Sequence, residues 1–494
     1  MALLDVTRRA SPVVWAAMVA VVVVVAHLPA FFHRLLDGDE AIYSSIAALL
    51  NNGGRLYAQG GVDNKPPGIF WVYAATFQVA GTYQMTAIHA VGLAVMGATC
   101  VLIFLAGRDI AGVRAGLIAA LLYGVLTAAG NPRLLASNTE IFMMLPLTAS
   151  VLLMLRRRWL WSGLLLVAAG AFRQVAAVTV LLVPIAIVWL EPRERRWQAS
   201  ALFAGGIIGG LAAGALLIAL TGSLSGFWRW TVGSLYGYAS TNWTFGLIWQ
   251  RAKDSVVPFV VDMAVIWLAA LAFALRWRHL DARERLLVVW LVVGMLGSFA
   301  AGHLSWHYFI QAMGPLAVLA AITIDRTAMR RWVTVAVVAG IAVPAIAWWA
   351  FDVSADPLTY DNSTPVPQHE VVAAYIHDHT RSTDRVFVWG DWPVLYVESD
   401  RLMASRFPGF LRGFARGSNQ PPDNWDTTAD VWPLLESDLA ANPPALIVDT
   451  AAAGWSDFGM YPMSNYPVLA ELVTSQYHVA ATVDDVVIYA RNGS

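Results

Sequence analysis

Residues 13–50 read VVWAAMVAVVVVVAHLPAFFHRLLDGDEAIYSSIAALL, and the order of their parts determines how the chain is organised. The apolar half is long enough to form a helix that crosses the hydrocarbon core of a bilayer, which takes about 20 residues. Asp37, Asp39 and Glu40 follow where a helix over 12–33 would leave the membrane. We therefore expect a membrane-spanning helix followed at once by an acidic segment at the membrane surface.

The whole chain has the composition of a polytopic membrane protein. Of its 494 residues, 58% are hydrophobic and 13% are charged, whereas a soluble domain carries about 25% charged residues. Its single cysteine, Cys100, lies in an apolar run, which excludes an intrachain disulfide and a cysteine metal site. Apolar runs predict about eleven transmembrane helices, over approximately 12–33, 84–106, 112–129, 139–155, 159–172, 175–190, 199–220, 256–275, 285–301, 308–324 and 332–350.

Basic residues in the short loops give the orientation, because cytoplasmic loops of membrane proteins are enriched in Lys and Arg. They are Arg8, Arg9, Arg108, Arg114, Arg156, Arg157, Arg158, Arg193, Arg195, Arg196, Arg276, Arg278, Arg283, Arg285, Arg326, Arg330 and Arg331. To keep all of them inside, the apolar stretch 66–80 must lie along the outer interface instead of spanning the membrane, with Trp71, Tyr73 and Phe77 near the headgroups.

The chain is predicted to have two domains. Residues 1–350 form the transmembrane domain, which includes the outer loop 34–83 with its interfacial helices. After Asp352, stretches such as RVFVWG, ALIVDT and DVVIYAR have the length and pattern of strands, and QHEVVAAYIHDHT and VWPLLESDLAAN have those of helices. Residues 351–494 are therefore predicted to be an α/β domain on the extracytoplasmic side.

The acidic segment can be interpreted in two ways. Asp37-x-x-Glu40 has the spacing of a capping box, which satisfies backbone N–H groups at the start of a helix. That helix is expected over 40–52 and to stop at NNGG. Capping leaves Asp39 without a structural duty, so Asp39 is the candidate for catalysis.

Lys65 is the basic counterpart of these acids. The two prolines of DNKPPG hold it in an extended backbone. Its side chain either extends toward the membrane interface to reach water, as lysines commonly do, or contacts a phosphate.

Four further residues are placed on the outer face by the topology: Arg133, Arg173, His307 and Tyr308. Arg173 lies between two short apolar helices, where a charge is costly and usually has a buried partner. A single histidine at the mouth of a helix, such as His307, is more often structural than catalytic.

Several of these motifs resemble those of the GT-C superfamily. Asp39-Glu40-Ala41-Ile42-Tyr43 is similar to the DE-x-x-Y of the family's first outer loop, and Lys65-Pro66-Pro67 resembles the KPP of lipid A aminoarabinose transferases and protein O-mannosyltransferases. ASNTEIFMMLP (136–146) resembles the loop with the family's second acid, here Glu140. HYFIQAMGPLAVLAA (307–321) and VFVWGDWPVLYVESDRLMASRF (386–407) resemble a late segment and the appended outer domain. The matches follow the family's order over nearly the whole chain.

The resemblance implies an inverting glycosyltransferase in a bacterial plasma membrane. It would move a sugar from a polyprenyl-phosphate donor to a cell-envelope acceptor (a lipid, a polysaccharide or a protein) on the extracytoplasmic face, in contact with membrane lipids and with no nucleic acid. Asp39 is then the base, and Glu40 and Glu140 are supporting acids. Lys65 contacts the donor phosphate, with Arg173, His307, Tyr308 and Arg133 as further contacts. No cofactor is required, although Asp39, Glu40, Glu140 and His307 could share a divalent cation.

Two other classes remain open. A transporter of lipid-linked saccharide would place ionisable residues near the bilayer midplane and show inverted repeats, but these acids lie in an outer loop. A non-catalytic scaffold would bind an envelope partner through residues 352–494.

Overall fold

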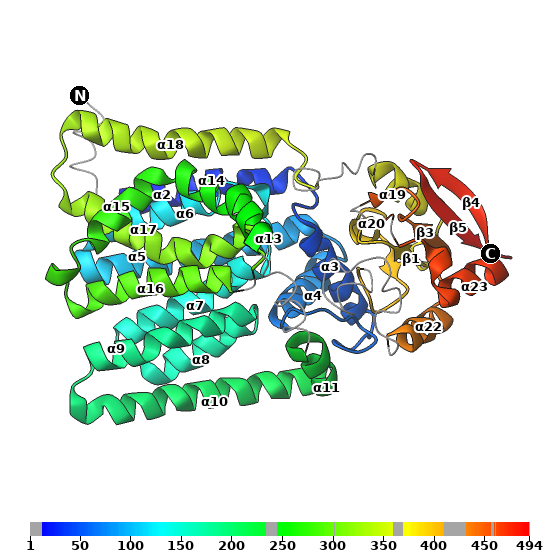
Figure 1. Cartoon of the computed structure of the whole chain (residues 1–494), viewed down its shortest axis with the longest axis horizontal. Coiled ribbons are helices and arrows are strands. Elements are labelled where there is room, and N and C mark those ends of the chain that lie inside the picture. The colour runs from blue at the N-terminus through cyan, green and yellow to red at the C-terminus, as the bar shows by residue number, and fades with distance from the viewer. Residues whose placement is uncertain are drawn as a thin grey trace. The chain divides into compact units, whose positions relative to one another are not determined.

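The computed structural model describes residues 12–233, 245–300, 302–358, 369–409, 431–455, 459 and 461–493. These residues form two compact units, each assembled from separate segments of the chain (Figure 1). Unit 1 comprises Met1–His33, His89–Gly214 and Trp243–Ala355, and unit 2 comprises Arg34–Ile88, Ala215–Asn242 and Asp356–Ser494.

Unit 1 is a bundle of helices. Its elements are α2 (Pro12–His27), η1 (Leu28–Phe31), α6 (Val113–Leu126), η2 (Pro132–Leu134), α7 (Thr139–Leu155), α8 (Trp159–Gly170), η3 (Gln174–Leu181), α9 (Leu182–Leu190), η4 (Arg193–Arg195), α13 (Phe245–Arg251), η6 (Ala252–Val256), α14 (Val257–Asp262), α15 (Ala264–Ala274), η7 (Trp277–His279), α16 (Ala282–Phe299), η8 (Trp306–Phe309), α17 (Ile310–Arg326) and α18 (Arg331–Ser354), with most of α5 (Met85–Ala111) and α10 (Arg196–Thr221).

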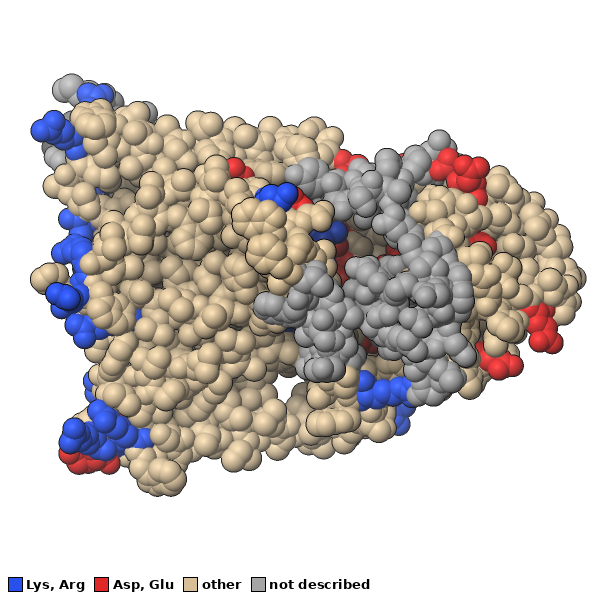
Figure 2. Space-filling model, in the orientation of Figure 1, with Lys and Arg blue, Asp and Glu red and all other residues tan. Residues whose placement is uncertain are grey.

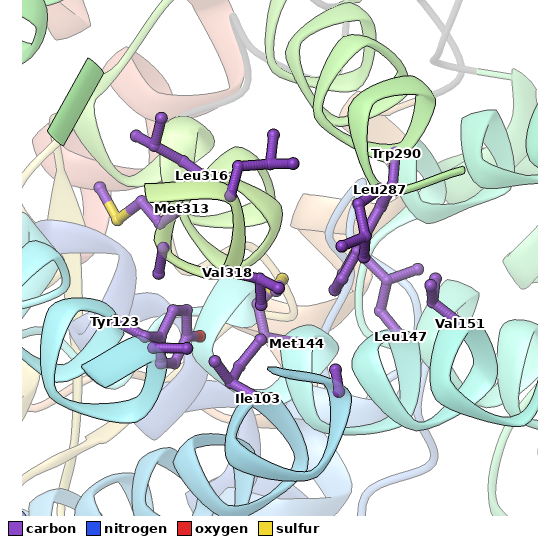
Figure 3. Packing of buried hydrophobic residues seen from close by; sticks show 14 of the residues in the cluster. Ile103, Tyr123, Met144, Leu147, Val151, Leu287, Trp290, Met313, Leu316 and Val318 are labelled. Carbon is purple, nitrogen blue, oxygen red and sulfur yellow. The ribbon is translucent and has the colours of Figure 1, made fainter. Parts of the chain in front are cut away.

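Helix α17 is the centre of this bundle. Every residue from Ile310 to Ile322 is buried, as expected of a helix that is apolar on all sides. It packs against α6, α7, α15 and α16, and Figure 3 shows Met313 and Val318 among side chains from α6, α7 and α16. A Cβ at Gly294 of α16 would lie 3.0 Å from the Gln311 carbonyl oxygen and 3.2 Å from Ala312 Cα, so a small residue suits the place where the two helix backbones approach.

Several helices have the length and hydropathy of membrane spans. Among the described residues, five qualify: Val13–Phe31, Met85–Ala111, Arg193–Thr221, Trp306–Arg326 and Arg331–Ser354. The pair Phe245–Asp262 and Ala264–Ala274, bent by 78°, makes a sixth if it is one broken span. All six coincide with predicted spans and fit an integral membrane protein. Four shorter apolar helices coincide with further predicted spans, and the count of about eleven stays a prediction.

The short loops of unit 1 that are rich in arginine are joined by ion pairs. Arg156 Nε lies 2.7 Å from Asp109 Oδ2, and Arg326 NH1 lies 2.6 Å from Glu284 Oε1. Figure 2 shows Lys and Arg gathered at the end of unit 1 where these loops lie. The common end agrees with the predicted grouping of the basic loops, while their cytoplasmic location stays a prediction.

Unit 2 combines two helices from residues 34–88 with short helices from residues 215–242 and with the C-terminal part of the chain. Its elements are α3 (Gly38–Asn51), α4 (Gly68–Ala80), α11 (Leu224–Phe227), η5 (Trp228–Gly233), α19 (His369–Asp378), β1 (Arg385–Trp389), α20 (Val394–Glu398), β2 (Leu402–Met403), α22 (Trp432–Ala441), β3 (Leu446–Asp449), η10 (Met463–Asn465), α23 (Pro467–Gln476), β4 (Tyr477–Val483) and β5 (Val486–Arg491). Helix α3 packs against α4, α20 and β2. The predicted division at residue 350 separates a transmembrane domain from an extracytoplasmic one, and it stays a prediction.

The C-terminal residues form the α/β structure that the sequence predicts. The sheet has the order β2-β1-β3-β5-β4. Strand β1 is parallel to β2 and β3, with Phe387 opposite Ile447, and β5 is antiparallel to β3 and β4. The stretches expected to be strands are β1, β3 and β5, and those expected to be helices are α19 and α22.

His369 makes the stability of this α/β structure depend on pH. Burial lowers the pKa of His369, but hydrogen bonds to Asp356 and Glu398 more than offset this and raise it to about 9. The ordinary pKa is about 6.5, so the charged imidazole stabilises the fold fully below pH 6.5, and this contribution is lost as the pH rises through 9. We expect the difference in Tm between the wild type and His369→Gln to shrink from pH 6.5 to 9. A difference independent of pH would contradict this assignment.

Candidate functional site

The acidic segment forms the start of α3. Asp37 is the N-cap, and its Oδ1 accepts a hydrogen bond from the Asp39 N–H at 3.3 Å. Glu40 is fully buried, and its Oε2 accepts from the Leu36 N–H at 2.8 Å. The predicted capping by Asp37 and the predicted helix ending at NNGG are confirmed, and Glu40 also satisfies a backbone donor. A role of Glu40 as a supporting acid stays a prediction.

The loop after α3 turns back onto this helix. At Gly61, φ is +120°, and a Cβ there would lie 2.7 Å from the Ile46 side chain. Only glycine tolerates both the backbone conformation and this close approach without strain. The Tyr57 N–H donates to the Gly61 carbonyl at 2.8 Å, which closes the turn. The returning chain thus brings residues 62–65 back beside α3.

Lys65 and Asp39 come together on unit 2. Lys65 Nζ lies 3.3 Å from Asp39 Oδ1 and 3.9 Å from Asp63 Oδ1. Its ammonium also lies 5.7 Å from the centre of the Tyr43 ring, and the Tyr43 hydroxyl donates to Asp39 Oδ2 at 3.2 Å. We call Asp39, Tyr43, Asp63 and Lys65 the Asp39 cluster. Asp39 and Lys65, the candidate base and the candidate phosphate contact, therefore lie side by side although more than two dozen residues separate them in the sequence.

Asp63 is a member of the cluster that sequence reasoning missed. Its Oδ1 accepts from the Lys65 N–H at 2.8 Å, as in an Asx turn. Burial raises the pKa of the Asp63 carboxyl, while the charge and the N–H of Lys65 act in the opposite direction. The spacing Asp63-x-Lys65, directly before two prolines, was the signal that could have identified it. The cluster therefore places two carboxylates around one ammonium.

The backbone of Lys65 is restrained from two more directions. Its carbonyl accepts hydrogen bonds from the Tyr57 hydroxyl at 2.8 Å and from Thr231 Oγ1 at 3.4 Å. Together with the bond of its N–H to Asp63, these contacts fix the main chain from which the ammonium extends. Lys65 is therefore a cation whose main chain is held by three hydrogen bonds.

Aromatic side chains of helix α4 pack against Tyr43 of the Asp39 cluster. The Tyr43 ring makes edge contacts with Phe70 at 5.8 Å and with Tyr73 at 5.7 Å. Tyr73 and Phe77 are buried, so the expectation that they lie near lipid headgroups is wrong. They pack against other aromatic side chains of unit 2 instead, and Trp71, which is half-buried, donates to Thr221 Oγ1.

A second polar cluster lies in unit 1 and consists of Glu140, Arg173, His307 and Tyr308; we call it the Glu140 cluster. Arg173 forms an ion pair with Glu140, and its guanidinium lies 4.0 Å from the centre of the Tyr308 ring. His307 Nε2 lies 3.7 Å from Glu140 Oε1. All four side chains are buried. The prediction that Arg173 has a buried partner is confirmed, and that partner is Glu140.

Local structure explains how three distant segments meet in this cluster. Glu140 is in the first turn of α7, and Arg173 stands in extended backbone between α8 and η3. Thr139 joins them, since its hydroxyl accepts from Arg173 NH1 at 3.1 Å and donates to Glu140 Oε2 at 2.9 Å. His307 and Tyr308 belong to η8, against which η2 packs. Arg133, on η2, is half-buried.

Each cluster has a different chemical capacity. The Asp39 cluster has an excess of carboxylate, whereas in the Glu140 cluster one carboxylate is matched by one guanidinium, leaving His307 to add positive charge when protonated. Within the residues that the structure describes, no three His, Cys, Asp or Glu side chains are grouped to hold a metal ion. A divalent cation stays a prediction to be tested.

The architecture is shared with known glycosyltransferases. The crystal structure of ArnT from Cupriavidus metallidurans bound to undecaprenyl phosphate aligns with a TM-score of 0.65 over 97% of this chain and 98% of that one, at 14% identity. The chain has the GT-C fold. The predicted resemblance is thereby confirmed, and the GT-C fold is that of integral membrane proteins.

Other comparisons agree with the GT-C fold. The oligosaccharyltransferase AglB from Archaeoglobus fulgidus, in complex with an inhibitory peptide and a dolichol-phosphate, aligns with a TM-score of 0.55 at 11% identity over 98% of this chain and 74% of its own. The arabinofuranosyltransferase AftD from Mycobacteria aligns with a TM-score of 0.50 at 15% identity over 98% of this chain and 40% of its own. Residues 64–219 match the family model for dolichyl-phosphate-mannose-protein mannosyltransferase. Comparison with curated protein sequences gave no match.

Proposed function

We propose that this GT-C protein is an inverting glycosyltransferase that takes a sugar from a polyprenyl-phosphate donor and transfers it to a cell-envelope acceptor on the extracytoplasmic face of a bacterial plasma membrane. The observation that carries the proposal is the Asp39–Lys65 pair, with 3.3 Å between Lys65 Nζ and Asp39 Oδ1. Such a pair provides a base for a hydroxyl and a cation for a phosphate side by side.

The reaction needs both groups. The acceptor oxygen forms a bond to the anomeric carbon as the bond from that carbon to the phosphate oxygen breaks, and the polyprenyl phosphate departs with the electron pair. A phosphate is already a good leaving group, so positive charge near the departing oxygen is the main requirement. Lys65 supplies this charge. Asp39 orients the acceptor hydroxyl and takes its proton.

The ion pair couples the two roles. While Lys65 is paired with Asp39, the carboxylate oxygen Oδ1 is occupied by the ammonium. A donor phosphate draws the ammonium toward itself, which leaves Oδ1 open to accept a hydrogen bond from the acceptor hydroxyl. Asp63 stays beside Lys65 throughout, because it is bonded to the Lys65 backbone. The donor therefore binds before Asp39 can act as the base.

The Glu140 cluster has a supporting part in this proposal. Arg173, His307 and Tyr308 are assigned to the donor phosphate, together with Arg133, and Glu140 orients the Arg173 guanidinium through their ion pair. The nature of the donor is supported by two proteins of the same fold, since ArnT was solved with undecaprenyl phosphate and AglB with a dolichol-phosphate. The divalent cation is tested by adding a chelator to the purified protein.

Substitution of Lys65 tests the proposal directly. Purified protein is incubated with a panel of polyprenyl-phosphate sugars, and release or transfer of sugar is measured. We expect wild-type turnover with at least one donor, and for Lys65→Gln a kcat lower by about 10²–10³-fold, the cost of removing one group that stabilises transition-state charge. Lys65→Arg retains the charge and should keep a larger fraction of the activity.

The same assay separates the competing functions. No turnover with any donor, combined with flux of lipid-linked saccharide across reconstituted vesicles, would favour the transporter. Wild-type turnover in Lys65→Gln would remove Lys65 from the donor site.

A further inference from the structure

The C-terminal α/β part contacts the loop that carries Lys65, within unit 2. The Val62 N–H donates to the Arg406 carbonyl at 3.0 Å, and Val62 is buried. On the adjacent residue, the Phe407 ring meets the edge of Trp230 at 6.0 Å. Thr231, next to Trp230, donates to the Lys65 carbonyl. Two routes thus lead from residues 406–407 to Lys65.

Arg406 is itself held by a buried carboxylate. Asp438 Oδ2 accepts from the Arg406 backbone N–H at 2.9 Å and from Nε at 2.8 Å, and Asp438 Oδ1 accepts from NH2 at 2.7 Å. The two side chains are 8% and 15% exposed, for Asp438 and Arg406 respectively. A two-point guanidinium–carboxylate contact fixes geometry as well as charge. Because Asp438 holds the main chain of Arg406 as well as its side chain, it also fixes the carbonyl that Val62 binds.

The connection to the Asp39 cluster is short. Val62 directly precedes Asp63, whose Oδ1 binds the Lys65 N–H and lies 3.9 Å from Lys65 Nζ. A shift of the Arg406 carbonyl would therefore move Asp63, and with it both the backbone and the ammonium of Lys65. Misplacement of a reacting group by about 1 Å costs about 10²-fold in rate.

We propose that Asp438 and Arg406 of the C-terminal α/β part are positioning residues for Lys65. They act through the Val62–Asp63 segment and touch neither donor nor acceptor. The catalytic part of the inference rests on the proposed function, while the structural part does not. In this way the C-terminal residues would help to position the cation for the donor phosphate, whether or not they also contact the acceptor.

The test uses the full-length protein and two readouts. In Asp438→Asn, an amide NH₂ replaces one acceptor oxygen, so the grip on Arg406 is weakened while the side-chain volume is kept. We expect faster amide hydrogen exchange at residues 61–65 and a kcat lower by about 10- to 100-fold. Arg406→Lys retains the positive charge and the backbone N–H but loses the two-point contact of the guanidinium with Asp438, and should show smaller changes of the same kind. If Asp438→Asn does not fold, Arg406→Lys provides the test in its place.

Asp400→Asn is the matched control. Asp400 pairs with Arg34 on the surface of the same unit, with side chains 47% and 39% exposed, and such pairs contribute little. We expect wild-type exchange at residues 61–65 and wild-type kcat. Unchanged exchange in both Asp438→Asn and Arg406→Lys would overturn the proposal. Faster exchange with unchanged kcat would also overturn it. If the wild type transfers no sugar, the proposed function fails, and faster exchange in Asp438→Asn still supports the positioning of residues 61–65.

Discussion

Asp39→Asn is expected to lose sugar transfer while the protein stays folded and inserted. Asparagine has nearly the same shape and can still accept the hydrogen bond from Tyr43, and Lys65 keeps Asp63 as a counter-charge. What is lost is the group that takes the proton of the acceptor hydroxyl, and removal of a general base costs about 10²–10⁴-fold in rate. The measurement is kcat of purified protein with a polyprenyl-phosphate sugar, together with the Tm.

Asp37→Asn is the control for this substitution. It makes the same chemical change two residues earlier, at the N-cap of α3, where asparagine caps as well as aspartate does. We expect turnover and Tm close to the wild type. Undiminished transfer by Asp39→Asn would exclude Asp39 as the base. An equal loss in both variants would indicate that the negative charge at the start of α3 matters and that no specific proton acceptor exists there.

The Asp39 cluster shows what a sequence can and cannot predict about a site. Asp39 and Lys65 were found because an acid beside a capping pair and a lysine before two prolines are both unusual in local terms. Their meeting follows from a loop that returns over α3, which Gly61 permits. Asp63 was overlooked because its importance lies in an Asx turn with Lys65, and a turn of this kind is a matter of backbone geometry that periodicity does not reveal.

Other features depend on contacts between distant segments. The cost of burying Arg173 predicted a partner, but only the fold shows that the partner is Glu140. The apolar stretch 66–80 was correctly expected to form a helix, yet Tyr73 is buried against Tyr43, and Phe77 against Tyr73 and Tyr83. Similarly, the strands after Asp352 could be predicted from their composition. The hydrogen bond from the Val62 N–H to the Arg406 carbonyl could not, because neither segment has a sequence pattern that indicates the other as its partner.

The Glu140 cluster leads to the second large effect. Glu140→Gln leaves the Arg173 guanidinium buried without its counter-charge, and breaking a buried pair in this way costs about 3–5 kcal/mol. We therefore expect a strongly lowered Tm in detergent and loss of activity with it. Loss of activity in this single variant cannot distinguish a structural pair from a donor site, because both would be destroyed together.

The double variant Glu140→Leu with Arg173→Met makes that distinction. Replacing a buried ion pair by apolar residues of similar volume is often neutral or stabilising, so Tm should recover to near the wild-type value. If Arg173 contacts the donor phosphate, the refolded double variant should still have a kcat/KM for the donor lower by about 10²-fold, because a charge that stabilises the departing phosphate is gone. Recovery of both Tm and kcat/KM would show that the pair only stabilises the bundle, and would remove Arg173 from the donor site.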